Sequence, residues 1–403
     1  MNDSCSMSMG ERRRRLLLGG VAALVLNVPR RGVARSEKPA NRAKISLATF
    51  GGVPGASPEV LIDSFEQAFA HLKLAGGGEL VVPPGIYDFG DCSSGGRVIS
   101  VDDLQNVVIS AYGATFRLKT TKKVIPLLFY FFNPNNVKVA GASFNDAGYD
   151  GDVDWRGMYC VKAEANRPCS GFTMVDCYVN GAVGLFQSQQ HGVNRYLMKD
   201  ISLHGTVENA YYGAGLTYVG DNARVDLICR NVRRGCISFG LKNAHIKIRM
   251  SHTADAPGSN GFIALACEGE SEGNVENVHI DLDVSGVGNH SALVHFYHVK
   301  SERLGYIRKV NAAVTVNNLK RGHTPTNVFV FDHELPSTAI LPSTARGWDQ
   351  IVLRGSVRGR LPGRLIHSPS RSTSSGTIYI ASELATRELN MSELPAYFRS
   401  KYP

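Results

Sequence analysis

The sequence predicts an all-β solenoid, a parallel β-helix, with a helix that caps its N-terminal end. Three observations predict it: a unit that recurs from about residue 171 to residue 367, alternation of apolar residues inside each unit, and an amphipathic segment before the first unit. Each unit joins an apolar-alternating stretch, a turn that usually carries Gly or Asn, and a second short apolar run. Such units bury a continuous core only when they stack. Because they contain short strands and no helix, the stack should be a parallel β-helix.

Seven first strands mark the repeat. The steps between them are 24, 27, 21, 34, 32 and 41 residues. The strands begin near Phe172, Tyr196, Ala223, Ala244, Val278, Val310 and Ile351. Solenoids of this kind bind extended ligands along one face, so the repeat also narrows the expected function.

Residues 1–34 are expected to be a secretory signal outside the fold. Arg12–Arg15 precede the apolar run LLLGGVAALVLNVP, which is too short to span a bilayer, and Gly32-Val33-Ala34 offers a cleavage site before Arg35. The paired arginines directly before the leucines resemble a twin-arginine signal, and the alternative is an ordinary general-secretion signal. Either route predicts a bacterial protein that is periplasmic or secreted, with no membrane span once the signal is removed.

The charge balance gives weak information about partners. The formal net charge is +9, and removing the signal takes away six of the 44 basic and two of the 35 acidic residues, which leaves +5. This mild excess favours an anionic partner only weakly. Nucleic acid is not expected as a partner, because the basic residues are scattered and no helix-turn-helix or zinc-finger spacing occurs.

The cysteines are expected to be free thiols in the core. Of the eight, Cys5 leaves with the signal, and the odd number that remains excludes complete intramolecular pairing. Twin-arginine substrates fold before export in a reducing compartment, which also favours thiols. No C-x-x-C pair is present to suggest structural zinc. Five cysteines lie in or beside apolar strand runs, where Cys behaves as a small hydrophobe: Cys160, Cys177, Cys229, Cys236 and Cys267.

The N-terminal cap follows a basic, polar and flexible lead-in at residues 35–45. Ser57 and Pro58 supply an N-cap and a first-turn proline. Gly76-Gly77-Gly78 ends the helix, and residues 79–82 open a strand. Such a helix can cover the open end of a solenoid, which would otherwise expose its core to water. The helical apolar face consists of Leu61, Phe65, Ala68, Phe69 and Leu72.

The chain resembles the pectin-lyase-like superfamily. The resemblance rests on the amphipathic helix and the following AGGGELVVPPGIYDFG, which is similar to the superfamily's AGGGTVYLPPGTY, and continues through NVVISAYGATFRL and NVKVAGASFNDAG over about residues 46–370. It implies a single-stranded right-handed parallel β-helix solenoid, here residues 46–380, with a tail at 381–403 that can form short helices. The superfamily includes polygalacturonases, pectate and alginate lyases, epimerases and phage tailspikes, so the resemblance is specific for fold rather than reaction.

A polygalacturonase-type hydrolase is disfavoured by the motifs. Those enzymes carry carboxylates in patterns such as NTDGI and GDDCI, whereas the nearest segments here read SNGFI and RRGCI. Asn260, Arg234 and Gly235 stand where carboxylates are expected. Glycoside hydrolysis needs an acid and a base or nucleophile that flank the bond.

β-Elimination from a uronate needs a base for the proton alpha to the carboxylate, and cations that neutralise the carboxylate. The predicted candidates for the catalytic base are Arg234, His290, His295 and Tyr297, with Arg156, Arg233 and His298 as substrate contacts. His295 and Tyr297 alternate with Val294 and Phe296, so they are expected to point outward together while the other two face the core. Alternatively, they are ordinary surface residues.

An acidic loop, FNDAGYDGDVDWRG, is the most conspicuous polar cluster. Its Trp155 and Tyr149 suit sugar stacking. An EF-hand is excluded, because Trp155 stands where Gly is needed and Val161 where Glu is needed. Three alternatives remain: calcium that bridges to a uronate as in family pectate lyases, a substrate-contacting loop without metal, or a solvated loop. The loop's carboxylates are Asp146 and the candidate calcium ligands Asp150, Asp152 and Asp154.

Polar residues after other strands are weaker candidates. Gln189, with its neighbours Gln187, Gln190 and His191, is suited to hydrogen-bonding sugar hydroxyls, although polar turns look the same. Glu268, Glu270 and the run 332–334 are also typical of turns.

Together these patterns predict an exported lyase that cleaves an acidic polysaccharide. The alternatives are a non-catalytic carbohydrate-binding or assembly module, including a homotrimer like the tailspikes, and a glycoside hydrolase or uronate epimerase. If the protein is an enzyme, the Asp loop, Arg234, His295 and Tyr297 are expected to converge on one groove.

Overall fold

The computed structural model describes residues 43–149, 151, 156–190, 196–252, 261–267, 273–288, 290–298, 306–322, 325–333, 347–368, 376–381, 383–384 and 398–399. They belong to one compact unit, Ala43–Pro403. Among these residues the helices are the 3-10 helix η1 (Leu47–Phe50) and helix α1 (Pro58–Leu74), and the rest of the regular structure is strand. The strands are β1 (Lys44–Ser46), β2 (Gly78–Val81), β3 (Gly85–Cys92), β4 (Gly96–Asp102), β5 (Gln105–Ser110), β6 (Ala114–Thr120), β7 (Pro126–Phe132), β8 (Asn135–Ala140), β9 (Ser143–Asp146), β10 (Tyr159–Ala165), β11 (Cys169–Gln190), β12 (Met198–Val219), β13 (Ala223–Ser251), β14 (Ile263–Cys267), β15 (Val275–Gly288), β16 (Ala292–His298), β17 (Ile307–Arg321), β18 (Asn327–His333), β19 (Trp348–Arg358), β20 (Ile366–His367), β21 (Ile378–Ile380) and β22 (Phe398–Arg399).

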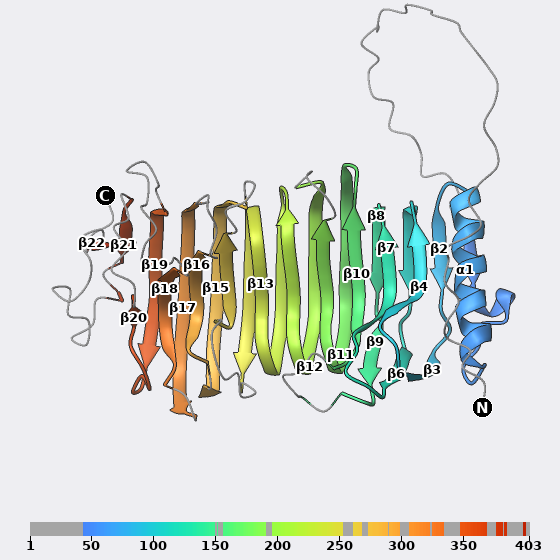
Figure 1. Ribbon diagram of the computed structural model, residues 1–403, viewed down its shortest axis with the longest axis horizontal. Helices are drawn as coiled ribbons and strands as arrows, with labels where there is room; N and C mark the ends of the chain where they lie inside the picture. The colour runs from blue at the N-terminus through green and yellow to red at the C-terminus, as the bar shows by residue number, and fades with distance from the viewer. Residues whose placement is uncertain are drawn as a thin grey trace, which may run out of the picture. The chain divides into compact units, whose positions relative to one another are not determined.

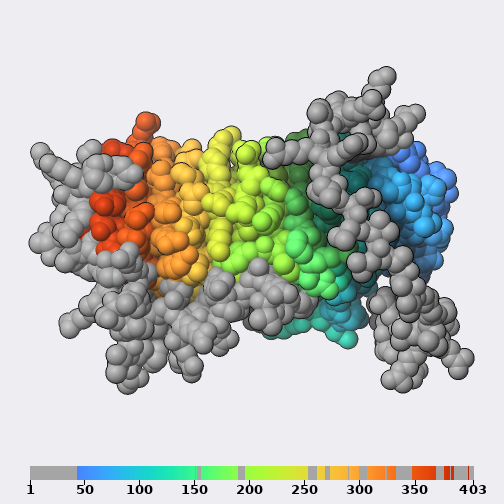
Figure 2. All heavy atoms as spheres, turned by 90° about the horizontal axis from the view of Figure 1, so that it is seen from above, coloured from blue at the N-terminus to red at the C-terminus, as the bar shows by residue number. Residues whose placement is uncertain are grey.

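The described strands form a right-handed parallel β-helix, which confirms the predicted fold. Each strand pairs in parallel with the strand one coil further along, as in the series β2–β5–β8–β11. Figures 1 and 2 show the coils following one another along the axis from the N-terminal to the C-terminal end. A parallel connection between strands of one sheet is right-handed in nearly all proteins, because of strand twist.

The later coils alternate long and short strands, and this makes two stacks. The long-strand stack consists of Leu241–Ser251 of β13 with β15, β17, β19 and β21. The short-strand stack consists of Cys236–Phe239 of β13 with β14, β16, β18 and β20. Inward side chains of both stacks fill one continuous core, and their outward side chains are available to form sites.

Helix α1 covers the N-terminal end of the stack, as predicted. Ser57 accepts a hydrogen bond from the Val60 amide through Oγ, and Pro58 occupies the first turn. The ring of Phe65 meets that of Phe129 edge-on at a centroid distance of 5.4 Å. Gly78 ends the connection with φ of +149°, where a Cβ would lie 2.3 Å from the Ala43 carbonyl oxygen. The predicted apolar face is fully buried, at Leu61, Phe65, Ala68, Phe69 and Leu72.

A column of residues with left-handed backbone sets the register of the coils. One such residue precedes the first inward side chain of each coil: Asn106, Asn136, Gly171, Asp200, Asn222, Asn243, Asn277, Lys309 and Gln350. Asparagine tolerates this conformation better than most residues. Its carboxamide also bonds to the coil beside it, since Asn277 Nδ2 donates to Asn243 Oδ1 at 2.7 Å and Asn243 Nδ2 donates to Asp221 Oδ1 at 2.5 Å.

Asn243→Ala is expected to lower the melting temperature more than Asn243→Gly. Alanine loses two ladder hydrogen bonds, worth about 1 kcal/mol each, and adds about 1–2 kcal/mol of left-handed strain. Glycine loses the same hydrogen bonds without the strain. Thermal unfolding of the three proteins checks the order, and a variant with alanine as stable as the asparagine protein would contradict it.

The structure corrects the position of one repeat and bears out the predicted state of the cysteines. Ile201, not Tyr196, lies opposite Phe172, so this step is 29 residues instead of 24. Burial raises the pKa of Cys236 to about 12, which keeps it a neutral thiol. The described cysteines are free, and the five predicted core thiols are buried: Cys160, Cys177, Cys229, Cys236 and Cys267.

The ends of the predicted domain fall partly outside the described residues. The signal at 1–34 lies there, and β1 begins at Lys44, inside the expected lead-in. Of the tail, Phe398–Arg399 forms β22 against β21, while the stretch expected to be helical is mostly not described. Within the described part, no helix has the length and apolar character needed to cross a bilayer.

Candidate functional site

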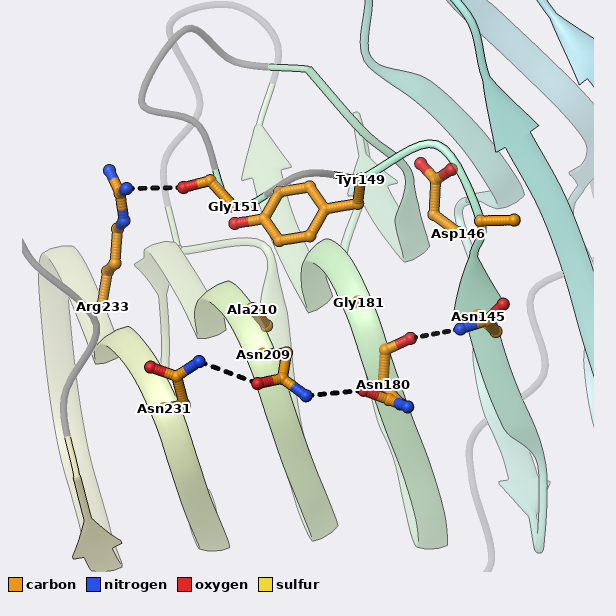
Figure 3. A pocket seen from close by; sticks show the side chains of 11 residues that line it. Asn145, Asp146, Tyr149, Gly151, Asn180, Gly181, Asn209, Ala210, Asn231 and Arg233 are labelled. Atoms are coloured by element: carbon orange, nitrogen blue, oxygen red, sulfur yellow. Dashed lines mark hydrogen bonds between the residues drawn. The ribbon is translucent and has the colours of Figure 1, made fainter.

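A groove of about 460 Å³ crosses the coils that contain β9, β11, β12 and β13 (Figure 3). Its lining is mostly polar, with one aromatic ring and one guanidinium. The lining residues are Asn145, Asp146, Ala147, Tyr149, Gly151, Asn180, Gly181, Asn209, Ala210, Asn231 and Arg233.

A row of asparagines forms one side of the groove (Figure 3). Asn231 Nδ2 donates to Asn209 Oδ1 and Asn209 Nδ2 donates to Asn180 Oδ1, both at 2.8 Å. Asn145 Nδ2 donates to the Asn180 carbonyl oxygen at 2.7 Å. The row places carboxamides of successive coils in line, and carboxamides both donate to and accept from hydroxyl groups. The sequence analysis missed this row, although an Asn at the same turn in the segments VNGA, VENA and CRNV is a visible signal.

Asp146 anchors the loop above the groove. Its carboxylate accepts hydrogen bonds from the Thr120 amide at 2.9 Å, the Thr120 hydroxyl at 2.6 Å, and the Gly148 and Met158 amides at 2.8 Å each. It is only 2% exposed. Asp146 is therefore not a solvated member of the acidic loop, because backbone donors bond to both of its oxygens.

Arg233 closes one end of the groove with part of its hydrogen-bonding capacity unused. Nη2 donates to the Gly151 carbonyl oxygen, as Figure 3 shows. The side chain is 8% exposed, and its Nε and Nη1 are buried with no hydrogen-bond partner among the described residues. A buried guanidinium with two unsatisfied N–H groups is costly unless a ligand accepts from them.

Tyrosine rings connect the groove to the outer face of the neighbouring strands. Tyr159, Tyr211 and Tyr212 form an apolar cluster with Val183, Ile237 and Ala264, and Tyr149 packs against it. The guanidinium carbon of Arg233 lies 5.5 Å from the centroid of the Tyr211 ring and that of Arg234 lies 5.4 Å from it. Tyr211 therefore links the groove residue Arg233 to Arg234 on the adjoining face.

Arg234 and His295 lie on two coils that are separated by the coil of Gly261. The register places Cys236 opposite Ile263 and Ile263 opposite Val294, so Gly261 lies between the coils of Arg234 and His295. A Cβ on Gly261 would lie 2.7 Å from His295 Cβ. The absence of a side chain at residue 261 leaves room for His295.

His295 is a buried, neutral imidazole. It is 2% exposed, and burial, followed by the charge of Arg234, lowers its pKa to about 4. Within the described part of the chain, neither ring nitrogen makes a hydrogen bond, and Asp332 Oδ2 lies 4.0 Å from Nε2. The ring centroid of Tyr297 lies 5.1 Å away.

The buried histidines predict a loss of stability in acid. Burial lowers the pKa of His290 and His295 to about 4, below the ordinary 6.5 that applies in the unfolded chain. The unfolded state therefore binds more protons, and stability present above about pH 6.5 is lost as the pH falls toward 4, by about 1.4 kcal/mol per histidine per unit. Melting temperatures across this range should fall less steeply for His295→Gln than for the unmodified protein. Equal slopes would contradict the assignment.

Two of the predicted site histidines have structural roles. His290 is completely buried: Nε2 contacts the Arg233 carbonyl oxygen and the ring meets Phe262 edge-on at 5.4 Å. His298 lies on the inward side with Phe296, bonds to the Gly347 carbonyl oxygen at 3.0 Å and packs on Trp348. The expectations that His290 acts as a base and that His298 binds substrate are wrong, since neither ring reaches the outer face.

The remaining predicted residues divide into three groups. Val294 and Phe296 face the core as expected, and Tyr297 is half-buried on the outer side, whereas His295 is much less exposed than expected. Arg156 donates to the Thr120 carbonyl oxygen at 3.3 Å and does not occur in the groove's described lining. Outside the described residues or side chains lie Asp150, Asp152, Asp154, Trp155 and Gln189.

Calcium stays a prediction that rests on the sequence alone. In the described ranges, no group of three His, Cys, Asp or Glu side chains is arranged to hold a metal ion. The three aspartates expected to bind calcium are not among those residues.

The predicted convergence on one groove is not found among the described residues. The loop residues Tyr149 and Gly151 line the groove, whereas Arg234, His295 and Tyr297 are not among its lining residues. Besides burial, the charge of Arg234 lowers the pKa of His295, and the Tyr297 ring lies beside that of His295. The tyrosine cluster and Arg233 connect this region to the groove.

Comparison with known proteins does not name a family. No family model matches the chain, and no curated protein matches it either. The solved structures similar to it include the catalytic domain of GH87 alpha-1,3-glucanase in complex with nigerose (10% identity, TM-score 0.49, 87% of this chain and 66% of that chain) and a mutant tailspike protein of E. coli bacteriophage HK620 in complex with pentasaccharide (12% identity, TM-score 0.33, 85% and 77%). The chain therefore spans about two thirds of the glucanase domain. At this level of identity, the neighbours do not indicate what this chain binds.

Proposed function

We propose that the protein binds an acidic polysaccharide in the groove and cleaves it by β-elimination. The observation that carries the proposal is Arg233, a buried guanidinium at the end of a polar groove, with two N–H groups that have no described partner. A uronate carboxylate fits these donors in charge, because each guanidinium nitrogen can donate a charge-assisted hydrogen bond to a carboxylate oxygen.

The rest of the groove fits a sugar chain. Asn180, Asn209 and Asn231 repeat a carboxamide from coil to coil, so successive sugar residues would meet successive hydrogen-bonding groups. The ring of Tyr149 offers an apolar face for a pyranose. An elongated polymer matches a groove that crosses several coils.

His295, which is not among the groove's lining residues but lies near Arg234, the neighbour of Arg233, is the proposed base. Its depressed pKa keeps it neutral at physiological pH, and Arg234 beside it helps to neutralise the uronate carboxylate. The imidazole takes the proton alpha to that carboxylate, the electron pair forms the carbon–carbon double bond, and the bond to the glycosidic oxygen breaks. Water protonates the leaving oxygen.

Asp146, the carboxylate of the groove's described lining, is engaged by four donors. It is therefore not available as the acid or base of a hydrolase.

The decisive assay is the ultraviolet absorbance of unsaturated uronate ends, recorded with the purified protein on polygalacturonate, alginate, hyaluronan and bacterial exopolysaccharides. A rise is expected on at least one of them. New reducing ends without that absorbance would indicate hydrolysis instead. Neither signal across the panel would replace the lyase with a binding protein. Calcium and chelator arms test whether a metal assists Arg233.

Gly261→Ala is expected to lower the elimination rate about tenfold or more and also to lower the melting temperature, since the crowded neighbours are the Cβ and the backbone nitrogen of His295. The new Cβ would lie 2.7 Å from His295 Cβ, so His295 has to move relative to Arg234, and misplacing a reacting group by a fraction of an ångström to an ångström is costly. Steady-state kinetics check this. Unchanged kinetics would show that the spacing of Arg234 and His295 does not matter.

Export is the second part of the proposal and rests on the N-terminal sequence. The arginine pair, the short apolar run and the small residues at 32–34 support a periplasmic or secreted protein in a bacterium. Fractionation of cells that express the full chain tests it, with Arg14→Lys and Arg15→Lys together as the variant. Processing that persists in this variant would indicate general secretion.

A further inference from the structure

A second groove, of about 440 Å³, lies on the outer face of the long-strand stack. It shares no lining residue with the first groove, and its lining comes from β15, β17, β19 and β21. The lining residues are Asn277, His279, Lys309, Val310, Asn311, Gln350, Val352, Arg354 and Tyr379.

The register of the strands explains the hollow. His279, Asn311, Val352 and Tyr379 lie side by side in one row across four strands. In the next outward row, Ala313 lies between Asp281 and Arg354. The short side chains of β17 therefore sit between larger side chains of the strands on either side.

The chemistry of this groove suits an anionic sugar. Asn311 Oδ1 is buried without a hydrogen-bond partner among the described residues, so it can accept from a hydroxyl group. Tyr379 provides an aromatic wall. Arg354 and Lys309 are the cations of the lining, and the described lining contains no carboxylate.

Lys309 lies beside Glu276, whose carboxylate accepts from Arg308 at 2.9 Å and pairs with Lys309 at 3.3 Å. An anionic group bound between Lys309 and Arg354 would be attracted by both cations.

We infer that the second groove is a non-catalytic binding site for an acidic polysaccharide, which holds the chain at a distance from the groove of Arg233. The identity of the polymer rests on the proposed function. The lining contains His279 as well as two cations, but this imidazole is exposed to water, unlike the buried His295 near Arg234, so the site is expected to bind without cleaving.

The test uses Arg354→Ala and Tyr379→Ala, with polygalacturonate and alginate as probes, each as polymer and as trisaccharide. Lys247→Ala is the matched control, because it removes a cation from the same stack that pairs with Asp226 at 3.7 Å, outside the groove. Affinity for the polymer should fall about tenfold in each groove variant, more at low salt than at high salt. The kcat/KM for the trisaccharide should stay unchanged, whereas Arg233→Ala lowers both.

The outcomes separate the two proposals. Polymer affinity equal to that of the unmodified protein in Arg354→Ala and Tyr379→Ala would overturn the second site and leave the lyase intact. Polymer binding that these variants lose, without any cleavage by the unmodified protein, would overturn the activity and support the second site. A protein that neither binds nor cleaves the probes overturns both. Circular dichroism and melting temperature confirm that each variant is folded.

Discussion

Arg233→Ala is expected to reduce kcat/KM on the acidic polymer by about 30-fold to several thousandfold, because truncating a buried charge that pairs with a ligand costs about 2–5 kcal/mol. The guanidinium is 8% exposed and has two N–H groups without a described partner, so little water screens its interaction with a carboxylate. The kcat/KM of Arg233→Lys should lie between that of the unmodified protein and that of Arg233→Ala, since lysine keeps the charge but lacks the planar guanidinium group. Steady-state kinetics on the polymer identified by the absorbance assay measure the effect.

Arg230→Ala is the matched control for this prediction. Arg230 lies on the same strand, but its side chain is 57% exposed and pairs with Glu208. Its loss should change kcat/KM by no more than about twofold, because exposed ion pairs contribute little. In a second control, the carboxylates of the polymer are chemically reduced to alcohols. On this neutral polymer, the unmodified protein and Arg233→Ala should have the same kcat/KM. A persistent difference on the neutral polymer would mean that Arg233 shapes the groove and does not bind the acid.

The architecture could be predicted from the sequence because it follows from local patterns. Ser57, Pro58 and the glycines at 76–78 fix the ends of the capping helix by chemistry within a few residues of each end. The alternation that places Val294 and Phe296 in the core is equally local. Repeat length was less reliable: Tyr196 begins an apolar run, but the coil is aligned by the left-handed residue Asp200 before Ile201.

The site was only partly predictable, because its residues depend on contacts between coils. The same alternation that puts Phe296 inside also puts His298 inside, so its misassignment was avoidable. The burial of His290 could not be predicted from the sequence, because it depends on Phe262 and on the carbonyl oxygen of Arg233, which is 57 residues away in the chain. In the sequence, Asp146 resembles the other aspartates of the acidic loop, but in the fold its carboxylate accepts hydrogen bonds from backbone amides of its own loop and of Thr120.

The asparagine row shows how one residue type serves both fold and site. Asn209 and Asn231 have φ of 49° and 53°, which favours asparagine over most side chains for backbone reasons alone. Because the turn repeats in every coil, the same choice lines up carboxamides along the groove. A residue chosen by the geometry of a turn thereby becomes a periodic hydrogen-bonding surface, which is what a periodic polymer requires.

His295→Gln is expected to lower kcat by about 10²–10⁴-fold with a smaller effect on KM, since general base catalysis contributes factors of that size in the transition state. The activity that remains in His295→Gln should not show the decline in acid that is expected of the unmodified protein. Burial and Arg234 lower the pKa of His295 to about 4, and the base acts only when neutral, so activity should hold as the pH falls from neutrality and decline only near pH 4. Steady-state kinetics between neutral pH and the onset of acid unfolding measure both.

The pH profile distinguishes catalysis from packing at this residue. If His295 had only a structural role, His295→Gln would lower the melting temperature and would change kcat and KM together. The pH at which the remaining activity declines in acid would then be the same as in the unmodified protein. If the activity of the unmodified protein instead declined near pH 6.5, the ordinary pKa of histidine, the imidazole of His295 would have to be accessible to water, contrary to its 2% exposure. If the decline in acid disappears in His295→Gln while the fold persists, the proton acceptor is the imidazole itself.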